Sequence, residues 1–85
     1  MQWDEIRRLN PHQWLLVEAV EAHSSAGRRV LDDLAVVQAF EEAKSAMDGY
    51  KDLHRQDPRR ELYVVHTDRD ELDVLESHWL GLRTA

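Results

Sequence analysis

The polar residues best placed to do chemistry follow the most apolar short segment of the chain. Leu62–His66 is the clearest candidate strand, and the polar run His66–Arg69 begins at its end. Functional groups are often presented where a strand passes into a loop. His66 could act as a general base, with Asp68 or Asp70 orienting its ring. The favoured interpretation is a strand end followed by a capped turn, so we assign no catalytic residue and keep His66 and Asp68 as weak candidates.

Metal binding would depend on histidines and carboxylates, because the chain contains no cysteine. The histidines are His12, His23, His54, His66 and His78. No two of them have the i, i+4 spacing that places two ligands on one helix face, and no His-Glu-x-x-His motif is present. His54 falls on or beside the apolar stripe of a predicted helix, which is typical of a packed histidine. It is a third weak catalytic candidate, and we predict neither a metal site nor a cofactor.

Other catalytic motifs are missing from the sequence. There is no Gly-x-Ser-x-Gly motif for a nucleophilic serine, and the 3 dispersed glycines cannot form a phosphate-binding loop. The adjacent pairs Asp32-Asp33 and Glu41-Glu42 are poorly placed to share a proton, because neighbours on a strand point to opposite faces. Solvated carboxylates are the favoured interpretation of both pairs.

The charge balance argues against broad contact with nucleic acid. The chain has a formal net charge of -6, whereas nonspecific binding to phosphates is carried mainly by Lys and Arg. One basic cluster exists, Arg55, Arg59 and Arg60, but Asp57 and Glu61 lie within it. We interpret this segment as a solvated loop, and nucleic-acid binding ranks third among the candidate functions.

The hydrophobic pattern predicts a helix and a hairpin in the first half of the chain. Residues 2–9 form a short predicted helix that ends at an Asn-Pro pair. A strand over about 13–22 and a second over Arg29–Phe40 are joined by the turn Ser24–Gly27. Asp32-Asp33 interrupts the second strand, and a bulge or bend there would let both carboxylates reach water.

The second half of the chain begins with a helical period. Its apolar stripe comprises Ala43, Ala46, Met47, Tyr50 and Leu53, with His54 at the border. Gly49 beside this stripe would allow a close approach to the sheet, and Asp57-Pro58 ends the helix. Strand Leu62–His66 and a turn over Thr67–Asp70 follow. The last segment, Leu72–Leu82, is predicted to be a fourth strand, with a helix as the alternative.

These elements predict an α+β fold in a single domain of residues 1–85. A short N-terminal helix precedes a ββαββ order, with a small, mainly antiparallel sheet and one long helix packed on one face. The crossover through the long helix should be right-handed if the strands that it joins are parallel in one sheet.

The predicted strands carry apolar side chains on both faces, because side chains alternate across a strand. The long helix covers one face, and the N-terminal helix is too short to cover the other. We therefore expect a homodimer or a stable complex with another protein. The candidate interface residues are Trp14, Leu16, Val36, Phe40, Tyr63 and Trp79. In the alternative, the fourth strand and the N-terminal helix fold over and complete the core.

The sequence gives little sign of a membrane or secreted protein. No apolar run approaches the ~18 residues that a membrane span requires. The acidic start, Met1–Glu5, lacks the order of a signal peptide. Together with the lack of cysteine, this indicates a cytoplasmic protein without membrane contact.

Four segments together resemble a known family. They are Pro11–Glu18, Asp52–Arg55, Glu61–Thr67 and Trp79–Gly81, with the patterns P-x-x-W-L-L-V-E, L-H-R, E-L-Y-V-x-H-T and W-L-G. Over about residues 3–83 the chain resembles a family of short uncharacterised bacterial proteins that are often encoded beside small retropepsin-like aspartic proteases. The resemblance implies a partner or regulator of such a protease. It does not imply the protease itself, because the chain has no Asp-Thr-Gly or Asp-Ser-Gly motif, and it assigns no catalytic residue.

The sequence thus favours a non-enzymatic protein-interaction module, acting as a homodimer or as a partner or regulator of another protein. The alternative is a small-molecule-binding or catalytic dimer with a pocket near His66. Such an enzyme would bring His66, Asp68 and His54 together in a cleft.

Overall fold

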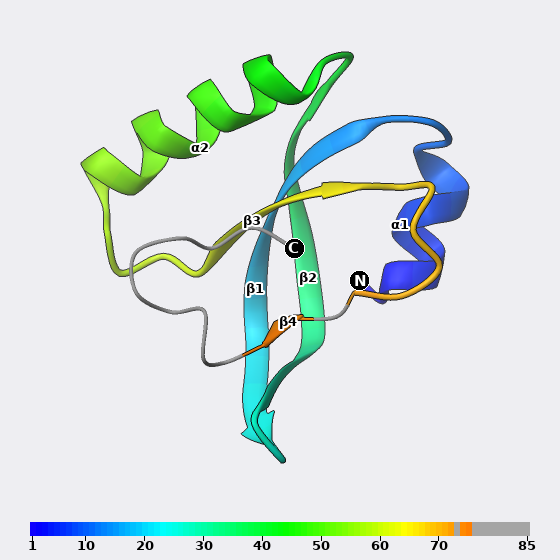
Figure 1. The fold of residues 1–85 in the computed structure, drawn as a ribbon, viewed down its shortest axis with the longest axis vertical. Coiled ribbons are helices and arrows are strands. Elements are labelled where there is room, and N and C mark those ends of the chain that lie inside the picture. Colours follow the sequence, from blue (N-terminus) through cyan, green and yellow to red (C-terminus); the bar gives the residue numbers. More distant parts are fainter. Residues whose placement is uncertain (73, 76–85) are drawn as a thin grey trace.

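The computed structural model describes residues 1–72, 74 and 75 (Figure 1). In chain order, their elements are α1 (Trp3–Leu9), β1 (Trp14–Ser25), β2 (Arg28–Phe40), α2 (Ala43–Gln56), β3 (Leu62–His66) and β4 (Val74–Leu75). The predicted α+β class is confirmed, as is the order of elements through β3. Of the predicted fourth strand, Leu72–Leu82, the structure describes Val74–Leu75 as strand. Its residues 73 and 76–82, which include His78 and Trp79, lie outside the described residues.

β1 lies at the centre of the sheet. The strand order is β3-β1-β2-β4, and β1 runs antiparallel to both β2 and β3. β2 and β3 are therefore parallel to each other, with β1 between them. A tight hairpin cannot join parallel strands, and α2 forms the crossover that connects these two.

The β1–β2 hairpin is longer than predicted because its turn is compact. Ser25 pairs with Arg28, which leaves Ala26 and Gly27 as the turn residues. Both have positive φ, 52° and 76°. This is the backbone geometry of a type I′ turn, whose twist matches that of the paired strands. β1 therefore continues to Ser25, beyond its predicted end at residue 22.

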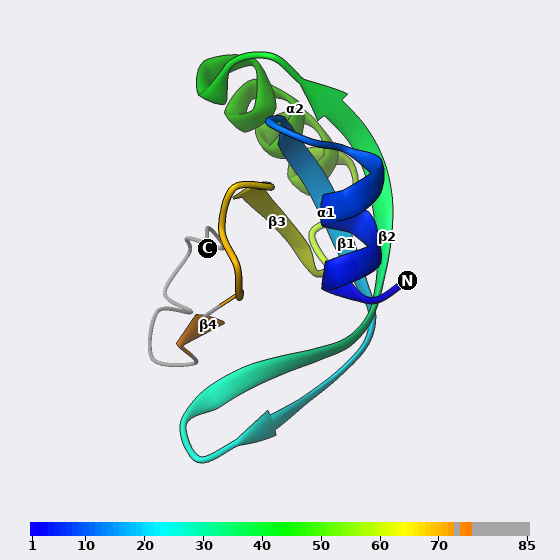
Figure 2. The same ribbon diagram turned by 90° about the vertical axis from the view of Figure 1, so that its right-hand side faces the viewer.

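Irregularities in the pairing bend this hairpin. The register skips Val37 and Asp32 in β2 and Val20 in β1. The skipped Asp32 confirms the predicted interruption at Asp32-Asp33. A bulge bends its strand and increases the twist, and Figure 2 shows the turn end of the ribbon curving away from the rest of the sheet. Val20 and Val37 are also among the large apolar residues that stay exposed.

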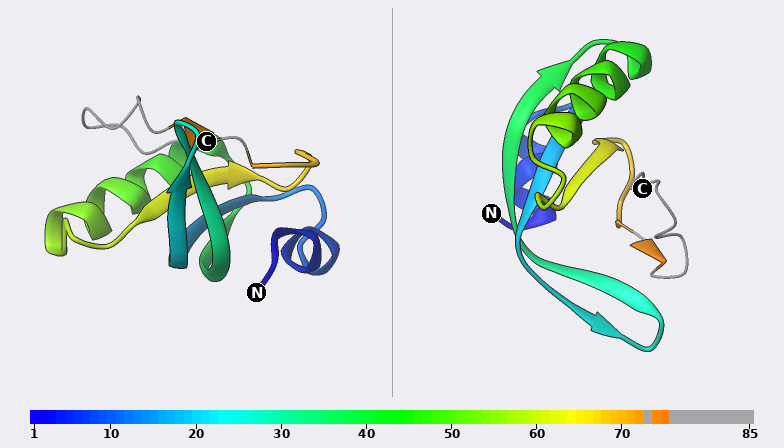
Figure 3. Two further views of the ribbon diagram at one scale, coloured as in Figure 1. Left: turned by 90° about the horizontal axis from the view of Figure 1, so that it is seen from below. Right: turned by 90° about the vertical axis from the view of Figure 1, so that its left-hand side faces the viewer.

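The two helices cover opposite faces of the sheet (Figure 3). On the α1 face, the buried residues are Ile6, Leu15, Val17, Leu34, Tyr63, Val65 and Val74. On the α2 face, they are Leu16, Ala46, Tyr50, Leu62 and Val64. Alternation along β1 and β3 produces this division, since neighbouring side chains of a strand point to opposite faces.

The expectation that the second face stays without cover inside the chain is wrong, because the N-terminal helix and the segment after β3 cover it together, as the alternative predicts. Ile6 of α1 is fully buried, as are Leu15 and Val17 of β1 in the same cluster. α1 does not cover this face alone, because Leu72 and Val74 pack on the same cluster from the chain that follows β3. Surplus apolar surface on the sheet therefore gives no reason to expect a dimer.

Gly49 brings α2 close to the end of β2. A Cβ atom at this position would lie 2.8 Å from Cζ of Phe40. The phenyl ring thus occupies the space that a side chain on the helix would need. This contact confirms the predicted close approach between the helix and the sheet.

The helices in the described part of the chain are short. The longer one, α2, has 14 residues. Neither is long and apolar enough to cross a membrane.

Candidate functional site

The loop after β3 is fastened to the start of β1. Thr67 is buried, and its backbone N–H donates to the Gln13 carbonyl at 3.0 Å. The Thr67 Oγ1 accepts a hydrogen bond from the Gln13 N–H, also at 3.0 Å. Because Trp14 pairs with His66 in the sheet, these bonds continue the β1–β3 contact beyond the strands. His66 is therefore held at a well-anchored strand end.

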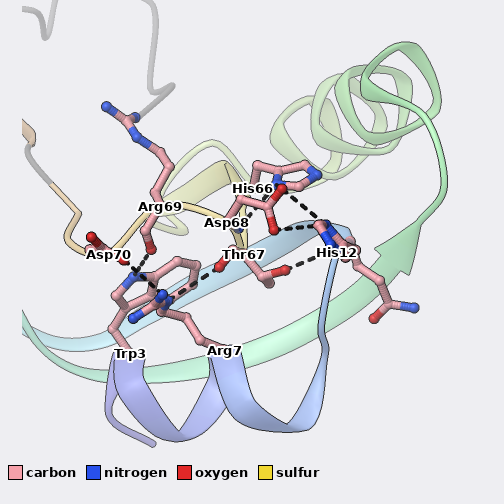
Figure 4. A network of polar contacts seen from close by, with 9 residues as sticks. Trp3, Arg7, His12, His66, Thr67, Asp68, Arg69 and Asp70 are labelled. Carbon is pink, nitrogen blue, oxygen red and sulfur yellow. Dashed lines mark hydrogen bonds and ion pairs between the residues drawn. The ribbon is translucent and has the colours of Figure 1, made fainter.

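The contact between His66 and Asp68 differs from that of a catalytic pair. The backbone N–H of Asp68 donates to Nδ1 of His66 at 3.0 Å (Figure 4). Nδ1 must then present its lone pair, so the neutral ring carries its proton on Nε2. In a Ser-His-Asp arrangement the carboxylate instead accepts a hydrogen bond from Nδ1–H. Oδ2 of Asp68 lies 3.6 Å from Nδ1, so Asp68 does not orient His66 in the way that general-base catalysis requires.

His12 is a partner of Asp68 that the sequence does not reveal. Its Nδ1 lies 2.9 Å from Oδ1 of Asp68. The backbone of His12 has a positive φ of 55° in the turn before β1, a conformation that few residues other than glycine adopt. The two side chains are 84% and 54% exposed, and exposed ion pairs contribute little to stability. The pair is thus a surface contact at the edge of the loop.

α1 holds the same loop from its other side. Nε1 of Trp3 donates to the Arg69 carbonyl at 3.0 Å, and Nε of Arg7 donates to the Thr67 carbonyl at 3.2 Å. Nη2 of Arg7 also donates to Oδ1 of Asp70 at 2.9 Å. Figure 4 shows these side chains extending from α1 to the loop. The polar groups of this region therefore fasten the loop to the helix.

An open hollow lies beside this loop, next to α1 and the turn before β1. Its lining residues are Asp4, Arg7, Arg8, Pro11, His12, Thr67 and Asp68. His66 is not among them. A ligand there would meet cationic and anionic groups that are already joined, because Arg7 lies 3.8 Å from Asp4 and His12 contacts Asp68.

His54 lies away from the loop. It stacks on Tyr50 one turn earlier in α2, with ring centroids 5.6 Å apart and an interplanar angle of 6°. α2 runs from the end of the sheet that holds His66 to the end where β3 begins. The structure therefore does not bring His54 together with His66 and Asp68, as a catalytic cleft would require. Nδ1 of His54 and the Tyr50 hydroxyl are buried and have no hydrogen-bond partner in the described part of the chain.

Three histidines of the described chain lie beside carboxylates. His23 contacts Asp32, with Nδ1 and Oδ2 2.6 Å apart, in addition to the contacts of His12 and His66 with Asp68. Within residues 1–72, 74 and 75, no group of three or more His, Asp or Glu side chains is arranged to hold a metal ion.

Carboxylates of the same domain neutralise much of the basic cluster. Arg60 donates two hydrogen bonds to Glu18, at 2.7 and 3.2 Å, and the bond to Glu18 raises the pKa of Arg60. The backbone N–H and the Nε of Arg59 both donate to Oδ1 of Asp57. These bonds, the backbone one above all, lower the pKa of Asp57. Paired arginines of this kind are poor anchors for a phosphate backbone.

The candidate interface residues fall into three groups. Leu16 and Tyr63 are fully buried within the chain, so their side chains present no surface to a partner. Trp79 lies outside the described residues. The candidates that are half-buried and pack against the two core clusters are Trp14, Val36 and Phe40.

The outer edge of β2 is only partly covered. β4 pairs with Arg28 and Arg29 at one end. Farther along, the Leu34 N–H donates to the Met1 carbonyl at 2.9 Å, and the Met1 amine donates to the Leu34 carbonyl at 2.7 Å. From Val36 to Phe40, no strand of the described chain pairs with the outer side of β2. We call Val36–Phe40 the open edge; Figure 2 shows it at the margin of the molecule, in the arrowhead end of β2.

The backbone of Ala39 faces outward from the open edge. Gln13, just before β1, accepts a backbone hydrogen bond from Thr67, and Ala19, within β1, donates one to Glu61. Both residues therefore direct their backbone groups toward the β3 side. Successive residues of a strand direct their backbone N–H and C=O groups to alternate sides. Leu16 is an odd number of residues, three, from both Gln13 and Ala19, so its backbone groups point toward β2. Its partner Gln38 therefore bonds toward β1. The next residue, Ala39, consequently directs its N–H and C=O away from the sheet.

No protein-family model, curated protein or solved structure matches this chain. The resemblance to short bacterial proteins stays a prediction. The contacts described above are therefore the basis on which a function can be argued.

Proposed function

We propose that this chain is a non-enzymatic protein-interaction domain that binds a partner strand along the open edge. The observation that carries the proposal is the unpaired outer side of β2 over Val36–Phe40 within the described chain. Unpaired N–H and C=O groups of an edge strand are a template for an added strand. Proteins usually protect such edges with lysine or proline, and neither occurs in the open edge.

The side chains of the open edge suit this role. Val37 is 36% exposed, and Gln38 and Ala39 are exposed beside it. The skipped pairing at Val37 interrupts the regular backbone spacing of β2. A partner has to match this bulge, which favours a specific segment over general edge-to-edge aggregation.

The polar loop after β3 supports the non-enzymatic part of the proposal. The Asp68 N–H occupies Nδ1 of His66, and Arg7 and Trp3 bond to loop carbonyls. His54 lies at the other end of the sheet. His66 and Asp68 thus have structural contacts of their own, and His54 stacks on Tyr50 away from both.

The partner could be a second copy of the chain or a different protein. A homodimer would join two open edges into one continuous sheet. A heteromeric partner would supply its own strand. A regulator of a small aspartic protease, which the sequence resemblance implies, is one form of the heteromeric proposal.

A small-molecule-binding role is the second candidate, and the open hollow beside the 66–70 loop favours it. Two of its cationic side chains, Arg7 and His12, already contact carboxylates, which leaves fewer groups to recognise a ligand. This candidate predicts that added metabolites shift the amide NMR signals of His12 and Asp68 and leave those of the open edge unchanged.

The proposal is tested with a matched pair of substitutions, Val37→Lys and Val20→Lys. Both valines are exposed and skipped in the strand pairing, but Val37 alone belongs to the open edge. A lysine on an edge strand opposes the addition of another strand. Each variant is used to capture partners from cells of the source organism, with quantitative mass spectrometry, and its molar mass is measured by light scattering.

We expect Val37→Lys to lose a partner, or a dimer, that the wild type and Val20→Lys both retain. Amide NMR spectra confirm that each variant is folded. If Val37→Lys keeps every partner and the wild-type mass, the open edge is not a binding site and the proposal fails.

A further inference from the structure

Acidic residues bracket the open edge. Asp32-Asp33 precede it and Glu41-Glu42 follow it, while residues 34–40 between them carry no charge. Lys44 is the sole basic residue from position 31 to position 50. An uncharged strand edge thus lies between two anionic ends.

All four carboxylates are accessible. Glu41 and Glu42 are exposed. Asp33 pairs with the Met1 amine, and its side chain is 44% exposed. Asp32 pairs with His23 and is 42% exposed. A carboxylate has lone pairs for several donors, so both aspartates can accept further hydrogen bonds from a partner.

The charges oppose a second copy of this chain as the occupant. Antiparallel pairing of two open edges would run each chain past the other in reverse order. Glu41-Glu42 of one copy would then face residues 34 and 35 of the other, close to Asp32-Asp33, at both ends of the interface. Like charges brought close together on neighbouring strands are destabilising, and each copy already carries a net charge of -6.

We propose that the occupant of the open edge is an extended segment of another protein, apolar at its centre and carrying Lys or Arg on both flanks. Val36–Phe40 bonds the centre of the segment, and Asp32, Asp33, Glu41 and Glu42 receive the basic flanks. This inference rests on the proposed strand-binding function and adds the chemistry of the partner.

The two parts of the site contribute differently. Main-chain bonds and apolar contacts along the edge supply most of the affinity in strand addition. The exposed carboxylates add little per pair and are screened by salt. They favour basic partners, reject acidic ones and speed association. Binding should therefore weaken as salt is added, without being lost.

The test uses the synthetic peptide Lys-Lys-Thr-Val-Thr-Val-Thr-Lys-Lys with blocked ends. Matched peptides replace the four lysines with glutamate or with serine. Affinities are measured by calorimetry at low and high salt, and the binding site is mapped by amide NMR shifts. We expect the lysine peptide to bind about tenfold more tightly than the serine peptide at low salt, with shifts at Val36–Phe40. The glutamate peptide should bind most weakly.

Two double variants separate the flanking acids from overall charge. Glu41→Gln with Glu42→Gln should weaken the lysine peptide about threefold or more and leave the serine peptide unchanged. Glu5→Gln with Asp48→Asn removes the same charge from exposed positions of the two helices that are not among the four flanking acids, and it should leave both affinities near wild type.

Ala39→Pro removes the outward N–H and should abolish binding of every peptide. Different results would overturn the basic-flank inference and the strand-binding proposal. Equal binding of the three peptides at the open edge, lost in Ala39→Pro, would overturn the basic-flank inference and leave strand binding intact. No binding of the lysine peptide also overturns the inference. Binding that Ala39→Pro does not change would place the peptide elsewhere and count against both proposals.

Discussion

At the scale of single residues, the proton on His66 separates a catalytic interpretation from a structural one. A base oriented by Asp68 would carry its proton on Nδ1 and offer Nε2 to a substrate. The hydrogen bond from the Asp68 backbone imposes the opposite tautomer. The same bond also draws the loop back over the strand end, which is the capped turn that the sequence favours.

The tautomer of His66 is directly measurable. We expect NMR spectra that correlate the ring C–H protons with both ring nitrogens to show a protonated Nε2 and an unprotonated Nδ1 in the neutral ring. Asp68→Asn keeps the backbone donor and should leave the tautomer unchanged. Asp68→Pro removes that donor and should abolish the preference. A neutral ring with its proton on Nδ1 in the wild type would contradict our account and restore the catalytic interpretation.

Gly49 offers a second prediction at this scale. Alanine is favoured over glycine inside a helix by about 1 kcal/mol, yet a Cβ here would lie 2.8 Å from the Phe40 ring. Overpacking a filled space costs roughly 1–3 kcal/mol. We therefore expect Gly49→Ala to lower the free energy of unfolding by about 1 kcal/mol, measured by urea denaturation.

The control for this prediction removes the ring. In a Phe40→Leu background the clash is relieved, and Gly49→Ala should then raise the free energy of unfolding. The same sign in both backgrounds would show that the Phe40 contact does not explain why this position is a glycine.

Among single residues, the sequence could indicate Gly49 and His66 but not His12. Gly49 borders an apolar stripe, and His66 ends an apolar strand, so each is visible in a local pattern. The contact of His12 with Asp68 joins positions 56 residues apart in the chain. It depends on how the turn before β1 meets the loop after β3, and no spacing in one sequence contains that information.

At the scale of elements, local periodicity was sufficient where one segment determines its own structure. The apolar stripe and the Asp57-Pro58 stop predicted α2, and the short apolar run predicted β3. The interruption at Asp32-Asp33 predicted a bulge or a bend. The length of α1 does not predict its role, because that role depends on contacts with the segment after β3. The hydrogen bond from Trp3 of α1 to the Arg69 carbonyl joins residues that are 66 positions apart in the chain.

The start of β3 is held by ion pairs that differ in burial. The Glu61 carboxylate accepts hydrogen bonds from Arg29 at 2.9 and 3.0 Å and from the Tyr63 hydroxyl at 2.6 Å, with its side chain 15% exposed. The neighbouring pair of Arg60 with Glu18 is more exposed. Removing one partner of a well-buried pair leaves the other charge uncompensated.

We therefore expect Glu61→Ala to lower the free energy of unfolding by about 2–3 kcal/mol. Glu18→Ala is the control, and it should cost about 1 kcal/mol or less because its pair is more open to water. Both losses are measured by urea denaturation at neutral pH. Equal losses, or a smaller loss for Glu61→Ala, would show that burial does not determine which of the two pairs contributes more to the free energy of unfolding.

At the scale of the whole molecule, both faces of the sheet are covered and one edge is open. The sequence predicted a partner from surplus apolar surface on the faces. In the described residues, α1 and the segment after β3 cover this apolar surface in place of a partner. The reason to expect a partner therefore moves from side chains on a face to backbone groups on the edge of β2. Hydropathy patterns do not report which strand ends up at an edge, because strand order depends on the crossover through α2.

We expect the charges around the open edge to decide whether the isolated chain pairs with itself. If repulsion between Glu41-Glu42 and Asp32-Asp33 keeps two copies apart, the wild type should be a monomer of 10.0 kDa in low salt. Salt screens such repulsion, so the dimer fraction should rise with ionic strength. Glu41→Gln with Glu42→Gln should raise it further, at low salt, in light-scattering measurements.

Adding Ala39→Pro to that double variant should return the chain to a monomer, because the outward N–H needed for edge pairing is gone. The control, Glu5→Gln with Asp48→Asn, lowers the net charge equally and should leave the mass unchanged. A wild-type dimer in low salt would mean that the acidic ends do not prevent self-pairing. Dimers that persist with Ala39→Pro would locate the self-contact on another surface. Either result would show that self-association does not depend on the site proposed for the basic partner.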